Sequence, residues 1–360
     1  MTLIAITSVC FPMFGSAAPA VAAVPAHTGS QVPAPPTASP ASVPQADRDR
    51  VLPPGWQRSS DRVVTTDGDS TGFHILVADA KDGYSWRTAA TLSEPGAETD
   101  QWIGQMCLTG SGRRAVVVYA QRQLVNDENT FREGGLVAVV DLDTGTVTKL
   151  PVRASLAYYD PGCGAGENAV ITQNFYAGDD YVSRLMTVDA ATGKVAQTVD
   201  TRGQVTSAVP VADGLVAAFG SYLVSVGSDG ALRDLAATDG APFRLTADSG
   251  AGVGYEVRAG GMTEIHRYAA GHDAVLARVA QDSVQLHQVA GAVFVQGPAA
   301  MTALRAASLP QSWHPVNVGQ GAQMSSQGVL AVTSASNQHE AAGAQPLATT
   351  PGEPLPVAVA

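Results

Sequence analysis

The chain has 360 residues, of which 45% are apolar and 15% are charged, and its formal net charge is −11. An acidic chain without a Lys/Arg-rich run is not typical of proteins that bind nucleic acid or an anionic membrane surface. The 37 glycines and 22 prolines predict many turns and exclude a fold made of long helices.

Residues 1–26 have the pattern of an export signal. An apolar stretch, Leu3 to Phe14, is followed by small residues and by Ala20-Val21-Ala22, an A-x-A cleavage pattern. The stretch is shorter than the ~20 residues that cross a bilayer, so we expect no transmembrane anchor. The first basic residue is Arg48, which leaves open a natural start upstream. The alternative is a buried apolar strand or helix. We predict a secreted bacterial protein whose mature chain begins between Ala23 and His27.

Residues 27–54 are rich in Pro, Ala and Ser. Such a segment buries too little apolar surface to offset the entropy lost on ordering. We therefore predict a flexible linker.

Residues 55–335 contain recurring apolar runs of four to seven residues separated by Gly- and Asp-containing turns, which is the pattern of strands and hairpins. One strand type recurs seven times, beginning at or next to Val63, Ala115, Ala169, Leu215, Val253, Ala292 and Val329. A hairpin with a glycine turn follows five of these strands, at Gly83, Gly145, Gly193, Gly230 and Gly271. A further short strand precedes most of them, so each unit holds about four strands.

Four-stranded units of about 40 residues are typical of the blades of a β-propeller, in which neighbouring sheets cover each other's faces. We predict an all-β protein with a propeller of seven blades, each of about four antiparallel strands. Six blades are the near alternative. Two β-sandwiches of about 130 residues each are the alternative fold.

Two hairpins, VDLDTGTVTKL and VDAATGKVAQTV, resemble the repeats of quinoprotein-like and YVTN-type β-propellers. The resemblance is good in these two units, looser in three others, and implies the propeller fold over about 270 residues. It departs from the quinone-dependent enzymes, since no tryptophan follows the turn. It therefore implies the fold and no activity.

After removal of the signal, two cysteines remain, Cys107 and Cys163. Two cysteines in an exported chain are expected to pair. Both precede a strand of the recurring type by a few residues, so we place them on the innermost strands of neighbouring blades and predict a disulfide. Two separate buried thiols are the alternative.

Signatures of catalysis are few. The sequence contains no phosphate-binding loop. His266 and His272 occupy the two arms of one hairpin, where we expect a solvated pair. Asp67 and Asp69 begin like a calcium loop but lack the downstream glutamate of an EF-hand, so they are weak metal candidates and an Asp/Gly turn is the preferred interpretation. We expect no cofactor, with calcium as the one ion the sequence allows.

The links between the second and third strands differ in length, and those of the first three units are long. They span residues 67–72, 121–135 and 176–182 and carry carboxylates and aromatic rings. Function concentrates in loops on a rigid scaffold, so we predict a ligand face there. Its candidate residues, with help from neighbouring links, are Trp102, Asp127, Glu128, Phe131, Tyr158, Tyr159, Tyr176, Asp179, Asp180 and Tyr181. The alternative is a set of solvated loops that keep the surface soluble.

Residues 336–360 are rich in Ala, Gln, Pro and Thr and end in an apolar run, which predicts either a low-complexity tail, the closing strand of the last blade or the start of a further region. For function we favour a secreted, monomeric, non-catalytic binding or scaffold module for an extracellular protein, glycan or cation, as the N-terminal part of a larger exported protein. The alternative is a propeller enzyme such as a lyase or glycosidase that uses acidic loop residues. A structural envelope protein is a third hypothesis.

Overall fold

The computed structural model of the chain describes residues 45–52, 54–60, 62–126, 128–156, 161–248, 252–280, 285–289, 292–296, 301–303, 322–324, 330–334 and 355–359. All of them belong to one compact unit, residues 38–360. The expected export signal and most of the expected linker lie outside the described residues.

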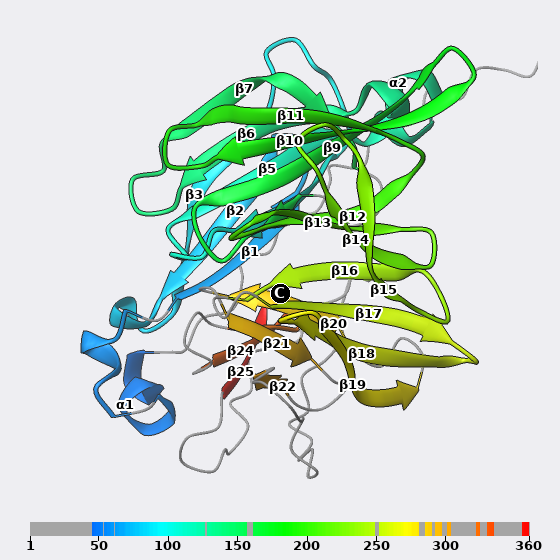
Figure 1. Cartoon of the computed structure of the whole chain (residues 1–360). Helices are drawn as coiled ribbons and strands as arrows, with labels where there is room; N and C mark the ends of the chain where they lie inside the picture. Colours follow the sequence, from blue (N-terminus) through cyan, green and yellow to red (C-terminus); the bar gives the residue numbers. More distant parts are fainter. Residues whose placement is uncertain are drawn as a thin grey trace, which may run out of the picture. The chain divides into compact units, whose positions relative to one another are not determined.

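Five consecutive sheets are built from strands that pair in the order in which they occur in the sequence (Figure 1). Sheet 1 contains β1 (Arg62–Gly68), β2 (Phe73–Asp79) and β3 (Ser85–Leu92). Sheet 2 contains β4 (Trp102–Leu108), β5 (Arg114–Gln121), β6 (Gly135–Asp141) and β7 (Val147–Ala154). Sheet 3 contains β8 (Gly162–Cys163), β9 (Asn168–Ala177), β10 (Asp180–Asp189) and β11 (Lys194–Arg202). Sheet 4 contains β12 (Val205–Val211), β13 (Gly214–Phe219), β14 (Tyr222–Val226) and β15 (Leu232–Ala237). Sheet 5 contains β16 (Pro242–Ala247), β17 (Val253–Ala259), β18 (Met262–Ala269) and β19 (His272–Ala280).

Two three-stranded sheets follow. One contains β20 (Gln285–Val289), β21 (Ala292–Gln296) and β22 (Met301–Ala303), and the other contains β23 (Ala322–Met324), β24 (Leu330–Ser334) and β25 (Leu355–Val359). β25 lies in the segment expected to be a tail or the closing strand of the last blade, and it pairs in parallel with β24. Parallel strands need a long connection, and 20 residues lie between these two. The number of blades stays a prediction.

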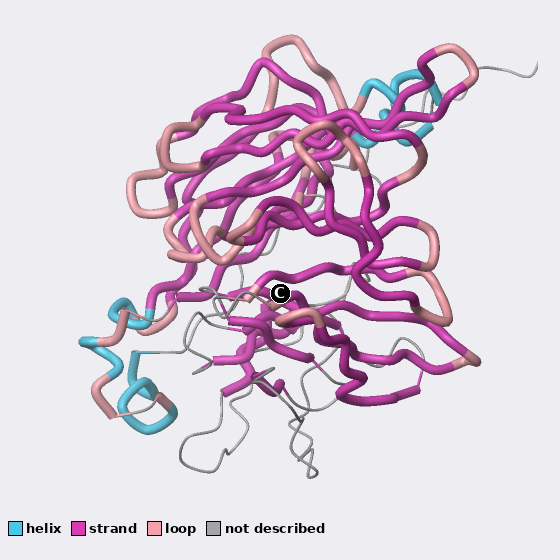
Figure 2. The backbone as a smooth tube through the Cα atoms, in the orientation of Figure 1, coloured by secondary structure: helices cyan, strands magenta, loops and turns pink. Residues whose placement is uncertain are grey.

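Helices are few and short in the described part of the chain. They are η1 (Gln45–Asp47), α1 (Arg48–Val51), η2 (Trp56–Arg58), η3 (Ala80–Asp82), η4 (Arg122–Asn126) and α2 (Glu128–Glu133). In Figure 2 they appear as cyan segments at the margins of the magenta sheets. None of the helices described is long and apolar enough to cross a membrane.

Strand β5, the second strand of sheet 2, shows why such strands are unbroken apolar runs in the sequence. Its alternate residues Val117 and Tyr119 pack in a cluster shared with sheet 1, and Val116 and Val118 pack in a cluster shared with sheet 3. A strand alternates its side chains between two faces, and both faces of sheet 2 are covered by neighbours. The same arrangement joins sheets 3 and 4 and sheets 4 and 5, so the core consists of layers between successive sheets.

The first strands of successive sheets lie next to one another: β4 contacts β1 and β8, β12 contacts β8 and β16, and β20 contacts β16. Consecutive sheets that stack face to face, with their first strands next to one another, make a β-propeller, as the sequence predicted. The strands expected at Ala115, Ala169, Leu215, Val253 and Ala292 are β5, β9, β13, β17 and β21, and each of the first four is followed by its predicted hairpin.

The repeated turn glycine has a structural reason. Gly145 and Gly230 adopt left-handed backbone angles, with φ of 72° and 80°. Each also lies against the outer strand of the preceding sheet, so that a Cβ on Gly145 would lie 2.6 Å from the carbonyl oxygen of Ala89. Glycine is the residue that meets both demands without strain. The turn therefore both closes a hairpin and packs one sheet against the next.

The predicted disulfide is confirmed. Cys107 at the end of β4 is bonded to Cys163 in β8, with 5.5 Å between the Cα atoms. These are the first strands of neighbouring sheets, where the sequence placed them. The bond closes a stretch of 56 residues that contains the whole of strands β5, β6 and β7.

Candidate functional site

Each of sheets 1 to 5 has two ends that differ in what they carry. One end holds the Asp- and Gly-containing turns at 80–84, 142–146, 190–193, 227–231 and 270–271, and we call it the turn end. The opposite end holds the links β1–β2, β5–β6, β9–β10, β13–β14 and β17–β18, and we call it the cleft end. The ligand face was predicted at the cleft end of sheets 1 to 3.

Residues 176–182 form a hairpin and not the loop expected. Strands β9 and β10 each run for ten residues and stay paired as far as Ala177 and Asp180, with a two-residue turn between them. Near the tip, the rings of Tyr176 and Tyr181 meet edge to face with 5.2 Å between their centroids, and Tyr176 is 55% exposed. An edge-to-face aromatic pair favours this pairing, which places both rings at the cleft end.

The long link between β5 and β6 is also ordered, as η4 and α2. Leu124 of η4 is buried in the core cluster of sheets 2 and 3, and Phe131 of α2 packs against the same cluster. The next residue, Arg132, holds its guanidinium 5.3 Å from the ring centre of Tyr176 on the neighbouring sheet. These contacts fix α2 beside the tip of β9 and β10, and Figure 1 shows α2 there at the upper right.

A pocket of about 130 Å³ lies between these two elements. It is lined by Phe131, Arg132, Ser155, Asn174, Phe175, Tyr176, Tyr181 and Gln204. These described residues supply four aromatic rings, two carboxamides, a hydroxyl and a guanidinium. We call this pocket the aromatic cleft. It gathers three of the predicted residues, Phe131, Tyr176 and Tyr181, from links that are about 45 residues apart in the sequence.

A buried serine holds Asn174, one of the residues that line the aromatic cleft. The Ser183 hydroxyl lies 2.8 Å from Oδ1 of Asn174 and 2.9 Å from the carbonyl oxygen of Gly203, and it accepts a hydrogen bond from the N–H of Val205. Ser183 is fully buried. It therefore fixes Asn174 and the link from β11 to β12 relative to each other, which keeps the cleft preformed.

Asp67 and Asp69 accept hydrogen bonds within the β1–β2 hairpin. Asp69 Oδ1 accepts hydrogen bonds from the N–H and hydroxyl of Thr71 and lies 3.1 Å from Nε2 of His74, and Asp67 accepts from the N–H of Gly68. This is the Asp turn that the sequence preferred. Among the described residues no three His, Cys, Asp or Glu side chains form a group that could hold a metal ion. Calcium binding stays a prediction.

Trp102 does not belong to an exposed face. It is the first residue of β4, its side chain is 2% exposed, and its ring lies 5.9 Å from that of Tyr119 in the core between sheets 1 and 2. The expectation that it helps to hold a ligand is wrong, because the ETDQ segment before it forms the link and the tryptophan already belongs to the strand.

The remaining candidates divide into two groups. Asp179 and Asp180 are exposed at the hairpin tip, and Asp180 lies 3.4 Å from Arg202 of β11. Asp127, Tyr158 and Tyr159 lie outside the described residues, as does the side chain of Glu128.

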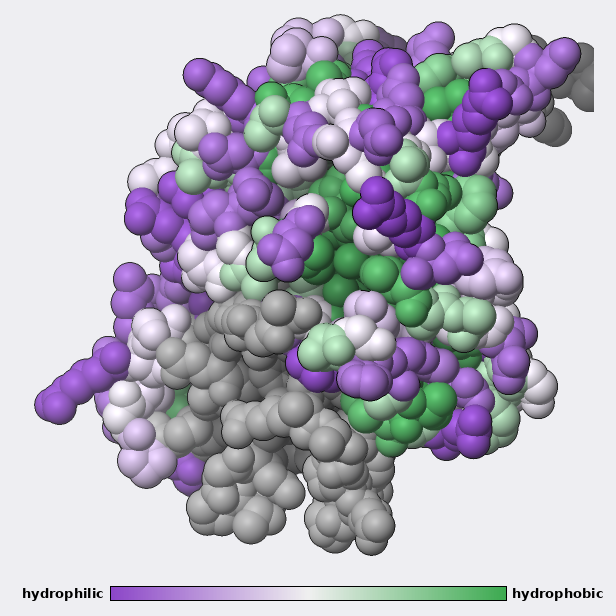
Figure 3. All heavy atoms as spheres, viewed as in Figure 1, coloured by the Kyte–Doolittle hydropathy of each residue, from purple (hydrophilic) through white to green (hydrophobic). Residues whose placement is uncertain are grey.

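Further apolar residues reach the surface at the cleft end. Five large hydrophobic side chains are classed as exposed in the described part of the chain, and Val125, Tyr176, Tyr222 and Met262 lie in or beside the second-to-third-strand links of sheets 2, 3, 4 and 5. Figure 3 shows apolar surface among hydrophilic groups beside α2. Tyr222 and Met262 were not among the predicted residues because their links are short, although each follows closely on a turn glycine.

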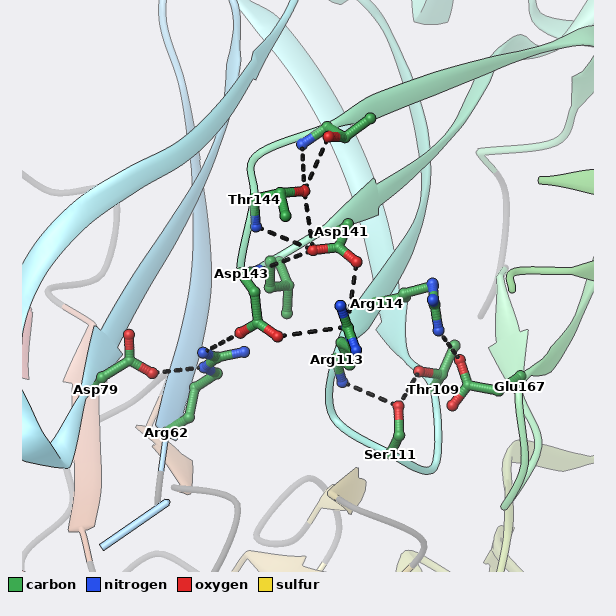
Figure 4. A network of polar contacts seen from close by, with 12 residues as sticks. Arg62, Asp79, Thr109, Ser111, Arg113, Arg114, Asp141, Asp143, Thr144 and Glu167 are labelled. Carbon is green, nitrogen blue, oxygen red and sulfur yellow. Dashed lines mark hydrogen bonds and ion pairs between the residues drawn. The ribbon is translucent and has the colours of Figure 1, made fainter. Parts of the chain in front are cut away.

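The turn end is organised by ion pairs and capped turns (Figure 4). Arg62 of β1 pairs with Asp79 at 2.7 Å and with Asp143 of the next sheet at 2.6 Å. Arg114 of β5 pairs with Glu167 of sheet 3 at 2.8 Å. Each arginine therefore links the turn of one sheet to the adjacent sheet.

Asp141 and Asp189 cap equivalent turns. Asp189 accepts hydrogen bonds from the hydroxyl and N–H of Thr192 and from the N–H of Ala191, and Asp141 accepts the matching set from Thr144 and Asp143. The Thr192 hydroxyl is the main cause of a lowered pKa at Asp189. At Asp141, burial opposes ionisation, but the hydrogen bonds from Thr144 outweigh it and the pKa is also lowered. Both carboxylates are therefore used in hydrogen bonds that stabilise the turns.

Comparison with known proteins gives a likeness to propeller structures. No model of a protein family matches the chain, and no curated protein matches it in sequence. A crystal structure of TolB from Acinetobacter baumannii is 14% identical, with a TM-score of 0.42 over 70% of this chain and 64% of TolB. The β-propeller domain of the trilobed protease from Pyrococcus furiosus is 10% identical, with a TM-score of 0.43 over 68% of this chain and 77% of that domain. A putative 6-phosphogluconolactonase from Bacteroides uniformis is 14% identical, with a TM-score of 0.43 over 75% and 87%.

Proposed function

We propose that this protein is a secreted, non-catalytic binding module that holds an extracellular glycan in the aromatic cleft. Secretion is supported by the export pattern of residues 1–26 and by the disulfide, since disulfides persist in oxidising compartments. The observation that carries the binding function is the cleft itself, a concave site where links from different units bring aromatic rings together with polar groups.

The chemistry of the lining supports a sugar as ligand. Aromatic rings offer flat apolar surfaces to the C–H face of a pyranose ring, and tyrosine adds a polar edge. Carboxamides both donate and accept hydrogen bonds, which suits sugar hydroxyls. Asn174 and Gln204 supply two carboxamides, and Arg132 supplies further donors. A site of rings and neutral amides with a guanidinium is a poor match for a cation.

The test begins with a glycan array probed with the purified chain. The highest-ranked glycan is then titrated against wild type, Tyr176→Ala and Tyr222→Ala by calorimetry. Tyr222→Ala is the matched control, since it also removes a half-exposed tyrosine at the cleft end, from sheet 4 rather than from the cleft. We expect Tyr176→Ala to weaken binding about 10-fold or more, because truncating an aromatic anchor of a binding site costs about 2 kcal/mol, and Tyr222→Ala to change it less than about twofold.

Equal affinities in all three proteins would place the site elsewhere. Absence of binding to any glycan on the array would contradict the proposed ligand class. Release of shortened or unsaturated products from a bound glycan would identify the enzyme alternative.

A further inference from the structure

A histidine in sheet 5 is buried between two carboxylates. His266 is in the middle of β18, is 4% exposed, and stacks on Tyr255 of β17 with 4.9 Å between the ring centres. Its Nδ1 lies 2.8 Å from Oδ2 of Asp273 on β19, and its Nε2 lies 3.1 Å from Oε2 of Glu264 on its own strand. The solvated His266–His272 pair expected from the sequence is wrong, because His272 pairs with Ala269 across the hairpin.

Only one protonation state satisfies both contacts. A neutral imidazole has one N–H donor and one lone pair, whereas ionised carboxylates only accept. With a neutral ring, one carboxylate would face a nitrogen lone pair inside the protein. With an imidazolium, both contacts become charge-assisted hydrogen bonds.

Both carboxylates are held in the ionised form by other partners. The Tyr255 hydroxyl donates to Oδ1 of Asp273 at 2.6 Å, and Nε of Arg278 donates to Oε1 of Glu264 at 2.5 Å. The hydrogen bond from Arg278 is the main cause of a lowered pKa at Glu264. Burial opposes ionisation of Asp273, but hydrogen bonds from His266 and Tyr255 outweigh it and lower its pKa. For His266, burial acts against the charged form, and the contacts with Asp273 and Glu264 outweigh it, so its pKa is raised above 6.5.

The side chains around His266, Asp273 and Glu264 are either apolar or already held in hydrogen bonds and ion pairs. Sheet 4 covers the same core layer with Val216, Ala218 and Leu223. The titratable and charged groups that face His266 or its partners are Tyr255 from β17, Glu264 and Tyr268 from β18, Asp273 and Arg278 from β19, and Asp239 from the link before β16. Nearby Glu256 pairs with Arg244, and Asp248 pairs with Arg267.

We propose that His266, as a buried imidazolium, clamps β17, β18 and β19 together and makes the β18–β19 hairpin a pH-sensitive element that loosens when the ring loses its proton. Sheet 5 contacts other parts of the molecule. Its strand β16 contacts β20 of the following sheet, and the exposed Met262 follows the β17–β18 link at the cleft end. Loss of the clamp would therefore affect both the cleft end of sheet 5 and its packing on the next sheet.

The direction of the pH effect follows from linkage. A raised folded pKa at His266 contributes stability that is complete below the unfolded value of about 6.5 and is lost as pH rises through the folded value. The lowered pKa values of Asp273 and Glu264 contribute stability above about 3.8 and 4.5 that is lost as pH falls. The clamp is therefore strongest in mildly acidic solution.

The first measurement is the titration of histidine ring nitrogens by NMR in ¹⁵N-histidine-labelled full chain. Signals are assigned with His266→Gln and, if that variant does not fold, with Arg278→Gln, which removes an exposed partner of Glu264. We expect the His266 signals to show both nitrogens protonated at pH 6 and a midpoint above 6.5. A neutral tautomer at pH 6, or a midpoint at or below 6.5, would overturn the proposal.

The second measurement is hydrogen exchange of β18 and β19 amides in wild type at pH 6 and pH 9, corrected for intrinsic rates. For each pH unit by which the folded pKa exceeds 6.5, loss of the proton raises the opening constant about 10-fold. We expect protection of these strands to fall in that proportion while that of β9 and β10 does not. His74→Gln is the matched control, since His74 forms its ion pair with Asp69 in sheet 1, at the β1–β2 hairpin, and it should leave the pH dependence of β18 and β19 unchanged. Equal pH dependence in sheets 3 and 5 would contradict the clamp.

Discussion

The two ends of the sheets use the same kinds of residue for different purposes. At the turn end, aspartates accept backbone hydrogen bonds and arginines join adjacent sheets, as Asp189 and Arg114 show. At the cleft end, the links vary in length and sequence, and they leave Tyr176, Tyr222 and Met262 exposed. The turns that repeat from sheet to sheet are therefore at the end that stabilises the fold, and the links that differ from sheet to sheet are at the end available to a ligand.

This difference between the two ends explains why the number of acidic residues in a link does not identify the ligand face. Asp67 and Asp69 are at the cleft end but cap a turn, so they resemble the turn-end aspartates in their role. Aromatic rings alone are no better guide, since Trp102 is buried in the core whereas Tyr176 is exposed. The predictions below test this division.

The largest expected effect comes from the covalent link near the turn end. In the chain-entropy model, removing a disulfide that closes 56 residues costs about 4 kcal/mol of folding free energy. Denaturant unfolding of the Cys107→Ala/Cys163→Ala variant at one pH measures this loss. A midpoint equal to that of wild type would show that the sheets are held by packing alone.

A glycine-to-alanine pair compares the two ends directly. Gly145 at the turn end and Gly178 at the cleft end have similar positive φ values, 72° and 65°. A Cβ at Gly145 would meet the carbonyl oxygen of Ala89, whereas nothing lies within 4 Å of a Cβ at Gly178. Gly178→Ala should cost about 1 kcal/mol from backbone strain, and Gly145→Ala roughly 3 kcal/mol. Thermal unfolding measures both, and equal losses would contradict tight packing at the turn end.

The capped turn predicts a pH-dependent loss. Asp189→Asn weakens the acceptor for Thr192 and Ala191 and should cost about 1 kcal/mol at neutral pH. Because the folded pKa of Asp189 is lowered, this contribution is present above the unfolded value of about 3.8 and disappears as pH falls. The difference in unfolding free energy from wild type should therefore shrink between pH 6 and pH 3. Asp179→Asn, at the exposed hairpin tip, is the control for removing one negative charge from a turn.

The smallest effect on stability is expected in the cleft. Tyr176→Ala removes a ring that is 55% exposed, so the free energy of unfolding should fall by less than about 1 kcal/mol, from the lost contacts with Tyr181 and Arg132. Chemical denaturation checks this value alongside the glycan titration. A loss as large as that of Gly145→Ala would show that the ring stabilises the hairpin and is not reserved for a ligand.

Local patterns predicted much of the fold. The turn glycines, the strands from Ala115 to Ala292 and the pairing of Cys107 with Cys163 are all found in the structure, because strand alternation and tight turns depend on nearby residues. The parallel pairing of β25 with β24 was not predicted, since it joins segments far apart in the sequence.

The site was predicted in part. Phe131, Tyr176 and Tyr181 were named as candidates, and they meet in the cleft because α2 packs on the core and β9 pairs with β10 as far as the hairpin tip. Asn174 and Phe175 were not named, since a residue within a strand gives no local sign that it faces a cleft. Gln204, in the short link between β11 and β12, was not named either. His266 was misjudged for a related reason: its partner Asp273 becomes a neighbour only through the register of β18 with β19.

The most direct test of the division between the two ends is carbene footprinting of the full chain, with and without the highest-ranked glycan from the array. We expect protection at residues 131–132, 174–176, 181 and 204, and no change at the turns 80–84, 142–146 and 190–193. Protection at those turns, with unchanged labelling of Tyr176 and Tyr181, would contradict the assignment of the cleft end as the binding surface.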